Sequence, residues 1–96
     1  MIQGSLKIIK IDERTGLRLK DAVFGLYNDL NQKIAELKTN ANGEAIYSGL
    51  PAGDYTLKEQ QAPEMYILTD TPDSFTIIDQ GRTVEKTIGN KKGFAT

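Results

Sequence analysis

The chain has 96 residues, of which 12 are basic and 13 acidic, for a net charge of −1. This length suits one domain over residues 1–96, with a single modest core expected at about 4–92. The balanced charge argues against nucleic-acid binding, and no apolar run approaches membrane-spanning length. Cys and His are absent, which excludes disulfides, Cys nucleophiles, Ser-His triads and zinc sites built on these ligands. No cofactor or metal is expected.

The first half of the chain predicts four strands, at residues 4–11, 22–27, 33–39 and 44–48. Leu6, Ile8 and Lys10 share one face of the first strand, but the opposite face is also apolar, so the sequence leaves the inward face open. The charges of the third strand favour a sheet edge. The Asn42-Gly43 pair after it predicts a hairpin to the fourth strand.

The second half predicts strands at 54–59, 74–79 and 83–90, an irregular stretch at 60–71 and a turn at 80–82. Residues 1–3 and 93–96 are expected to be flexible ends, with the tail fraying from Lys91 onward. No segment has helical periodicity. About seven short strands with regularly spaced turn signals predict an all-β sandwich.

Three of these strands end an apolar face with a polar residue. Lys10 follows Leu6 and Ile8. Glu59 follows Tyr55 and a leucine, and Asn90 ends the apolar face of the last strand. Each residue alone is most simply a strand end that reaches water. If the three converge, they form a buried amine, carboxyl and carboxamide that supply one another with partners.

Such a trio has a specific chemistry. Burial favours the neutral forms of Lys10 and Glu59, and a neutral amine is a nucleophile. A protonated Glu59 can donate a hydrogen bond to the Asn90 carbonyl oxygen and relay protons between the amine and the leaving group. The product is a Lys–Asn isopeptide bond with loss of ammonia. The domain would form this bond once, on itself, and would not be a turnover enzyme.

An ordered set of short motifs covers nearly the whole chain, from Gly4 to Lys92. It comprises Lys10-Ile11-Asp12, Thr15-Gly16, Leu19-Lys20-Asp21-Ala22-Val23-Phe24, Asn42-Gly43, Gly49-Leu50-Pro51-Ala52-Gly53-Asp54-Tyr55, Leu57-Lys58-Glu59, Ala62-Pro63 and Ile88-Gly89-Asn90-Lys91-Lys92. This set resembles the B-type repeat (CnaB-like) domains of Gram-positive collagen adhesins and pilins. The resemblance implies an Ig-like or prealbumin-like β-sandwich in which Lys10 bonds to Asn90 with assistance from Glu59.

The resemblance also implies a place and partners. It implies a secreted, cell-wall or cell-surface protein, although no signal-peptide or anchoring pattern occurs in this sequence. The expected partners are neighbouring domains of the same surface protein and, as an alternative function, a host extracellular-matrix protein. A further alternative is a parent scaffold for an engineered split peptide ligase. No nucleic-acid or membrane partner is expected, and the domain is expected to be a monomer.

Other candidate residues have simpler readings. Lys7 is a competing amine, but it lies on the opposite face from Lys10 and lacks the following Asp. Asp12 and Glu13 suggest a cation site, yet acidic residues in a turn are expected to be solvated, and Ca²⁺ needs more oxygen ligands. The tyrosines are expected to be half-buried strand residues rather than a ligand patch. The family usually has Gly where this chain has Met65, so the loop beside Glu59 is expected to follow a different path, because Met does not readily take a positive φ.

Overall fold

The computed structural model describes residues 4–68, 71–78 and 81–93. Within them, seven strands form in chain order: β1 (Gly4–Asp12), β2 (Val23–Tyr27), β3 (Lys33–Lys38), β4 (Glu44–Leu50), β5 (Gly53–Gln61), β6 (Asp73–Ile77) and β7 (Thr83–Asn90). The predicted all-β fold is confirmed, and the last strand has the predicted bounds. The predictions for residues 1–3, 69–70, 79–80 and 94–96 lie outside the described residues.

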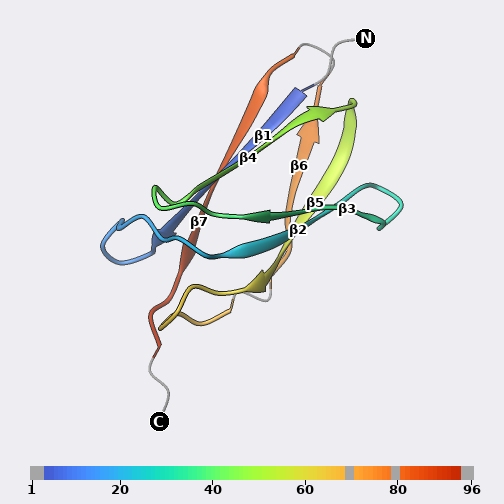
Figure 1. Ribbon diagram of the computed structural model, residues 1–96. Coiled ribbons are helices and arrows are strands. Elements are labelled where there is room, and N and C mark those ends of the chain that lie inside the picture. Colours follow the sequence, from blue (N-terminus) through green and yellow to red (C-terminus); the bar gives the residue numbers. More distant parts are fainter. Residues whose placement is uncertain (1–3, 69–70, 79–80, 94–96) are drawn as a thin grey trace.

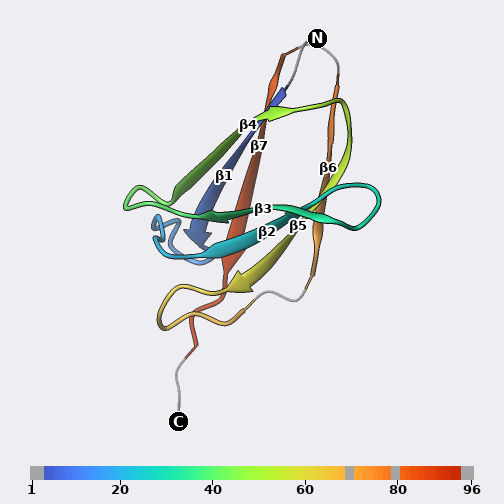
Figure 2. The same ribbon diagram turned by 45° about the vertical axis from the view of Figure 1, so that its right-hand side comes forward.

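The strands form two facing sheets (Figures 1 and 2). One sheet has three strands in the order β4-β1-β7, and the other has four in the order β3-β2-β5-β6. β1 pairs antiparallel with β4 and parallel with β7. The first and last strands are therefore neighbours, although nearly the whole chain lies between them. The third strand lies at a sheet edge, as its charges predicted.

The hairpin predicted at Asn42-Gly43 is wrong. The turn itself forms, since the Gly43 amide donates to the Asn40 carbonyl at 2.9 Å and Gly43 has a φ of 72°. However, β3 and β4 lie in different sheets, so the turn carries the chain from one sheet to the other. Local turn chemistry fixes the reversal, while burial of both inner faces decides which strands pair.

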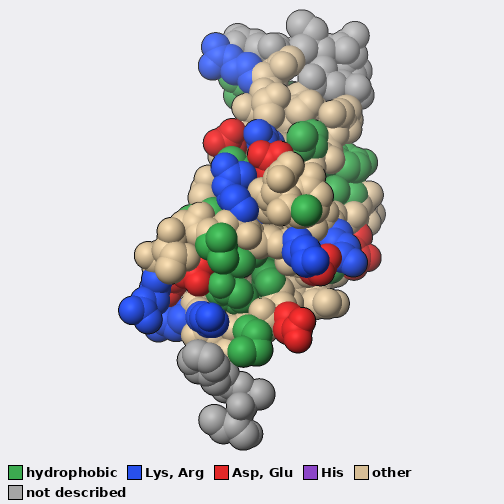
Figure 3. Space-filling view, turned by 60° about the vertical axis from the view of Figure 1, so that its left-hand side comes forward, with side chains coloured by type: hydrophobic (Ala, Val, Ile, Leu, Met, Phe, Trp, Pro, Cys, Tyr) green, Lys and Arg blue, Asp and Glu red, His purple; other side chains and the backbone are tan. Residues whose placement is uncertain are grey.

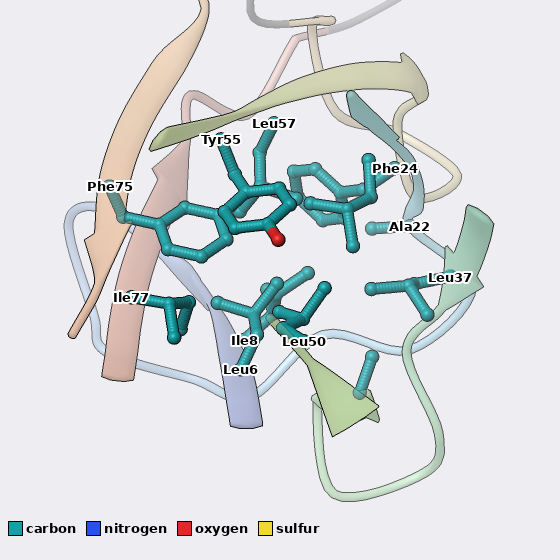
Figure 4. Close-up of a cluster of buried hydrophobic side chains, with 12 residues drawn as sticks. Leu6, Ile8, Ala22, Phe24, Leu37, Leu50, Tyr55, Leu57, Phe75 and Ile77 are labelled. Atoms are coloured by element: carbon teal, nitrogen blue, oxygen red, sulfur yellow. The ribbon is translucent and has the colours of Figure 1, made fainter. Parts of the chain in front are cut away.

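The core lies between the two sheets (Figure 4). It is built from alternate side chains of the strands, and Leu6 and Ile8 of β1 are completely buried in it. This resolves the inward face of β1, since Lys10 continues the same alternation. On the neighbouring strands β5 and β6, the rings of Tyr55 and Phe75 stack with centroids 5.6 Å apart.

The sequence predicted that the tail frays from Lys91 onward, and this prediction is wrong for residues 91–93. The Ile67 amide donates to the Lys91 carbonyl at 2.9 Å, and the Gly93 amide donates to the Met65 carbonyl at 3.0 Å. Residues 91–93 thus continue from β7 alongside the loop that follows β5. Backbone hydrogen bonds of this kind hold a segment that lacks a core of its own.

Met65 does take a positive φ, of 73°. The expectation that Met would send this loop along a different path from one with Gly is therefore wrong at this residue. The left-handed conformation is strained for a residue with a Cβ, and the hydrogen bonds on either side of Met65 hold it there. The loop keeps the backbone shape that a Gly would adopt without strain.

Candidate functional site

The three polar residues singled out in the sequence come from three strands and both sheets. Lys10 and Asn90 lie near the same end of the parallel pair β1 and β7, where Lys10 is opposite Ile88 and Asp12 is opposite Asn90. Glu59 lies on β5 of the facing sheet. The two sheets therefore present the amine, the amide and the carboxyl to one another across the core.

The carboxyl of Glu59 contacts both other groups. Its Oε2 lies 3.1 Å from Nζ of Lys10, and its Oε1 accepts a hydrogen bond of 3.0 Å from Nδ2 of Asn90. Lys10 and Asn90 have no exposed surface, and Glu59, counted as a whole residue with its backbone, is 9% exposed. The alternative in which each residue is a strand end reaching water is wrong, because all three are buried.

The surroundings of Lys10 disfavour its charge. Its Nζ lies 5.6 Å from the centroid of the Phe24 ring, within the apolar end of the core. Burial lowers the pKa of the Lys10 amine from its ordinary value, and the charge and hydrogen bond of Glu59 act in the opposite direction without reversing this. The neutral form of the Lys10 amine is consequently more populated than that of an exposed lysine.

The Asn90 carboxamide has a second partner that the sequence did not indicate. Its Nδ2 also donates to the backbone carbonyl of Ile67 at 3.1 Å. No side-chain pattern could have identified this contact, because every residue carries a carbonyl and only the course of the loop brings this one to Asn90. The amide nitrogen thus lies between two oxygen acceptors.

Asp12 is buried rather than solvated, which corrects the sequence prediction for that residue; Glu13 is exposed as expected. The hydroxyl of Tyr66 donates to Oδ2 of Asp12 at 2.8 Å, and Oδ1 accepts from the backbone amides of Arg14 and Thr15. The Tyr66 hydrogen bond, followed by the Arg14 amide, lowers the pKa of the Asp12 carboxyl, and the same bond raises the pKa of Tyr66. The signal in the sequence was the position of Asp12 on the same face of β1 as Lys10.

The remaining candidates lie apart from this trio. Lys7 forms an ion pair of 3.3 Å with Glu44, on the other face of β1. Tyr27, Tyr47 and Tyr66 are half-buried, whereas Tyr55 is a core residue. Within residues 4–68, 71–78 and 81–93, no group of three or more acidic side chains is arranged to hold a metal ion. The same residues contain no helix of the length and apolarity that a membrane crossing requires.

A cavity of about 340 Å³ adjoins the site between β5 and β7. Glu59, Phe24 and Ile88 are among the residues that line it, together with Thr71, Pro72 and Asp73.

The sandwich of three and four strands, with its first and last strands paired in parallel, is a prealbumin-like domain. The chain belongs to the family described as the SpaA prealbumin-like fold domain, whose model matches residues 4–92. It is also 35% identical over 104 aligned residues to the collagen adhesin of Staphylococcus aureus, covering 90% of this chain and 9% of the adhesin. The resemblance to CnaB-like domains of Gram-positive adhesins and pilins is confirmed.

Solved structures agree with this assignment. The TIE protein of Bacillus anthracis superposes with a TM-score of 0.90 at 33% identity, over 95% of this chain and 17% of that one. The minor pilin GBS52 of Streptococcus agalactiae gives 0.84 at 28% identity, over 99% of this chain and 47% of that one. The chain thus spans less than half the length of these relatives.

Proposed function

We propose that this domain is a structural module of a Gram-positive surface adhesin or pilin that joins Lys10 to Asn90 through an intramolecular isopeptide bond. The observation that carries the proposal is the bridging carboxyl of Glu59, which contacts the Lys10 amine through one oxygen and the Asn90 amide through the other. A single proton relay thus lies between the nucleophile and the leaving group.

The reaction balances without an added reagent. The neutral Nζ of Lys10 attacks Cγ of Asn90, and the bond from Cγ to Nδ2 breaks. Glu59 takes part as the neutral acid: it gives one proton to Nδ2, which leaves as ammonia, and takes one proton from Nζ, so it ends protonated as it began. The contact of Oε1 with Nδ2 supports the relay, because it places the carboxyl of Glu59 against the leaving nitrogen.

The cavity beside Glu59 suits the departure of ammonia. Glu59, whose carboxyl contacts the leaving nitrogen, lines this cavity together with residues of β5 and β7. Loss of the small product to solvent makes the reaction effectively irreversible, since the buried site does not retain it.

The bond would close a loop of about 80 residues, which on the chain-entropy model contributes about 4 kcal/mol to the free energy of unfolding. It would also redirect force. Because β1 and β7 run parallel, Gly4 and Asn90 lie at opposite ends of the sheet, so tension between the chain ends shears these strands. A covalent link between them would carry that tension past residues 11–89.

The place and partners of the domain follow from its relatives. A cell-surface location and neighbouring domains of the same protein fit proteins of which this chain spans only part.

A host-matrix ligand is the second candidate, because one relative is a collagen adhesin. The face in Figure 3 carries basic and acidic side chains interspersed, with hydrophobic side chains grouped toward the C-terminal end. Saturable binding to immobilised collagen would support that candidate.

The test of the proposed function is the intact mass of the denatured protein. The expected result is a mass below that of the sequence by one ammonia, with a cross-linked peptide that contains Lys10 and Asn90. A full mass, with both residues recovered in separate peptides, would refute the cross-link.

A further inference from the structure

The orientation of the Asn90 carboxamide is set by the carbonyl of Ile67. A carbonyl oxygen only accepts hydrogen bonds, so the end of the carboxamide that faces it must be the NH₂ end. Glu59 does not impose this choice, since a protonated carboxyl could donate to Oδ1 as readily as a carboxylate accepts from Nδ2. The observed 3.1 Å contact of Nδ2 with Ile67 therefore keeps the leaving nitrogen against Glu59.

The Ile67 carbonyl is held from two sides. On the β7 side, the amide of Ile67 donates to the Lys91 carbonyl at 2.9 Å, and Tyr66 forms a backbone bridge to Lys92. On the β1 side, the Tyr66 hydroxyl donates to Asp12, and backbone amides of the following turn fix that carboxylate. The loop is thus attached to both strands that supply the reacting side chains.

We propose that Tyr66, through its hydrogen bond to Asp12, is a positioning residue for the cross-link. It touches none of the reacting atoms. It holds the loop so that the Ile67 carbonyl keeps Nδ2 of Asn90 in contact with Glu59. This inference rests on the proposed function, because it concerns the rate of the same bond.

A time course of bond formation tests the inference. The full chain is made in a short pulse of cell-free synthesis, samples are denatured at intervals, and the fraction that has lost ammonia is measured by intact mass. Tyr66→Phe is expected to slow bond formation about tenfold, as loss of a hydrogen bond to a charged group does when the bond is needed in the transition state.

Tyr55→Phe is the matched control. It removes one tyrosine hydroxyl that donates to the Pro51 carbonyl at 2.7 Å, away from the site. It should leave the rate within about twofold of the wild type. An equal rate for Tyr66→Phe and the wild type, or an equal slowing in both variants, would overturn the inference. A wild-type chain that never loses ammonia would instead overturn the proposed function.

Two further readouts separate positioning from folding. Asp12→Asn keeps a polar partner for Tyr66 and is expected to react faster than Asp12→Ala. In the unreactive Lys10→Ala background, hydrogen exchange of the Asn90 side-chain NH₂ should be faster when Tyr66 is replaced by Phe. Unchanged exchange in the folded double variant would overturn the inference even if the rate of the single variant could not be measured.

Discussion

The amine of Lys10 lies 3.1 Å from Oε2 of Glu59 although neither side chain has more than 2% of its surface exposed. An ionised pair in such a place loses hydration that its mutual attraction repays only in part. Transfer of one proton from the amine to the carboxylate leaves two neutral groups, which are less costly to bury. Burial therefore weakens this contact as a salt bridge and favours the neutral form of the Lys10 amine.

Replacement of Asn90 by Ala should remove the cross-link and leave a folded sandwich of lower stability. Loss of about 4 kcal/mol of chain-entropy stabilisation corresponds to a melting temperature lower by roughly 15 to 30 °C in a domain of this size. Thermal unfolding followed by circular dichroism measures it. Asn42→Ala, at an exposed turn residue, is the control and should keep both the ammonia deficit and the melting temperature. An unaltered melting temperature in Asn90→Ala would contradict the stabilising role.

Glu59→Gln should leave Lys10 and Asn90 in place but unreacted. Gln has nearly the same shape and can still hydrogen-bond, but it has no acidic proton to relay. The denatured variant should show the full mass of its sequence. Glu44→Gln, which alters the surface carboxylate paired with Lys7, should lose ammonia normally. Cross-linking of Glu59→Gln at the wild-type rate would mean that Glu59 is not the relay.

Stretching a single molecule by its ends should distinguish the linked from the unlinked domain. In the wild type the segment 11–89 should not extend, because the force passes from β1 to β7 through the bond. In Asn90→Ala the same segment should unfold and lengthen the chain by on the order of 250 Å. If wild-type protein whose mass shows the bond still extended by the full length of residues 11–89, this force path would be refuted.

Asp12 should make the domain sensitive to acid. Its pKa is lowered in the folded state, chiefly by the Tyr66 hydrogen bond, so the unfolded chain binds more protons between that pKa and the ordinary value of about 4. The stabilisation is complete above about pH 4 and is lost as the pH falls through the folded-state pKa.

Denaturant unfolding at a series of pH values measures this effect, in the Asn90→Ala background, where no cross-link can hold the unfolded chain together. Asp12→Asn should flatten the acid dependence, while Asp29→Asn, at an exposed site, controls for the loss of a charge. Parallel pH profiles with and without Asp12 would contradict the prediction.

Met65→Gly should stabilise the loop beside the site. Met65 has a φ of 73° and is 53% exposed, so Gly would relieve the left-handed conformation at little cost in packing. The relief of about 1–2 kcal/mol exceeds the entropic cost of Gly, about 0.5–1 kcal/mol, for a net gain of roughly 0.5–1 kcal/mol. The denaturant midpoint in the Asn90→Ala background measures it. Met65→Ala keeps the Cβ and should show no gain; an equal gain in both would assign the effect to the lost side chain.

The alternation of side chains along single strands was sufficient to predict most of the fold. It gave the bounds of β7 and the apolar faces that end in Lys10, Glu59 and Asn90, while the charges of β3 indicated its edge position. These features are local, because the direction of a side chain on a strand depends only on its place in the alternation.

What the sequence by itself determined, then, is the all-β class, with its apolar faces, and the three polar residues that interrupt those faces. Only the tertiary structure decided that β1 pairs in parallel with β7, that the Asn42-Gly43 turn crosses between sheets, that Asp12 is buried against Tyr66, and that the Ile67 carbonyl faces Asn90. The reason is physical: these contacts join residues far apart in the chain. They form because both sheets bury their inner faces together, and no local pattern encodes which backbone group then meets which side chain.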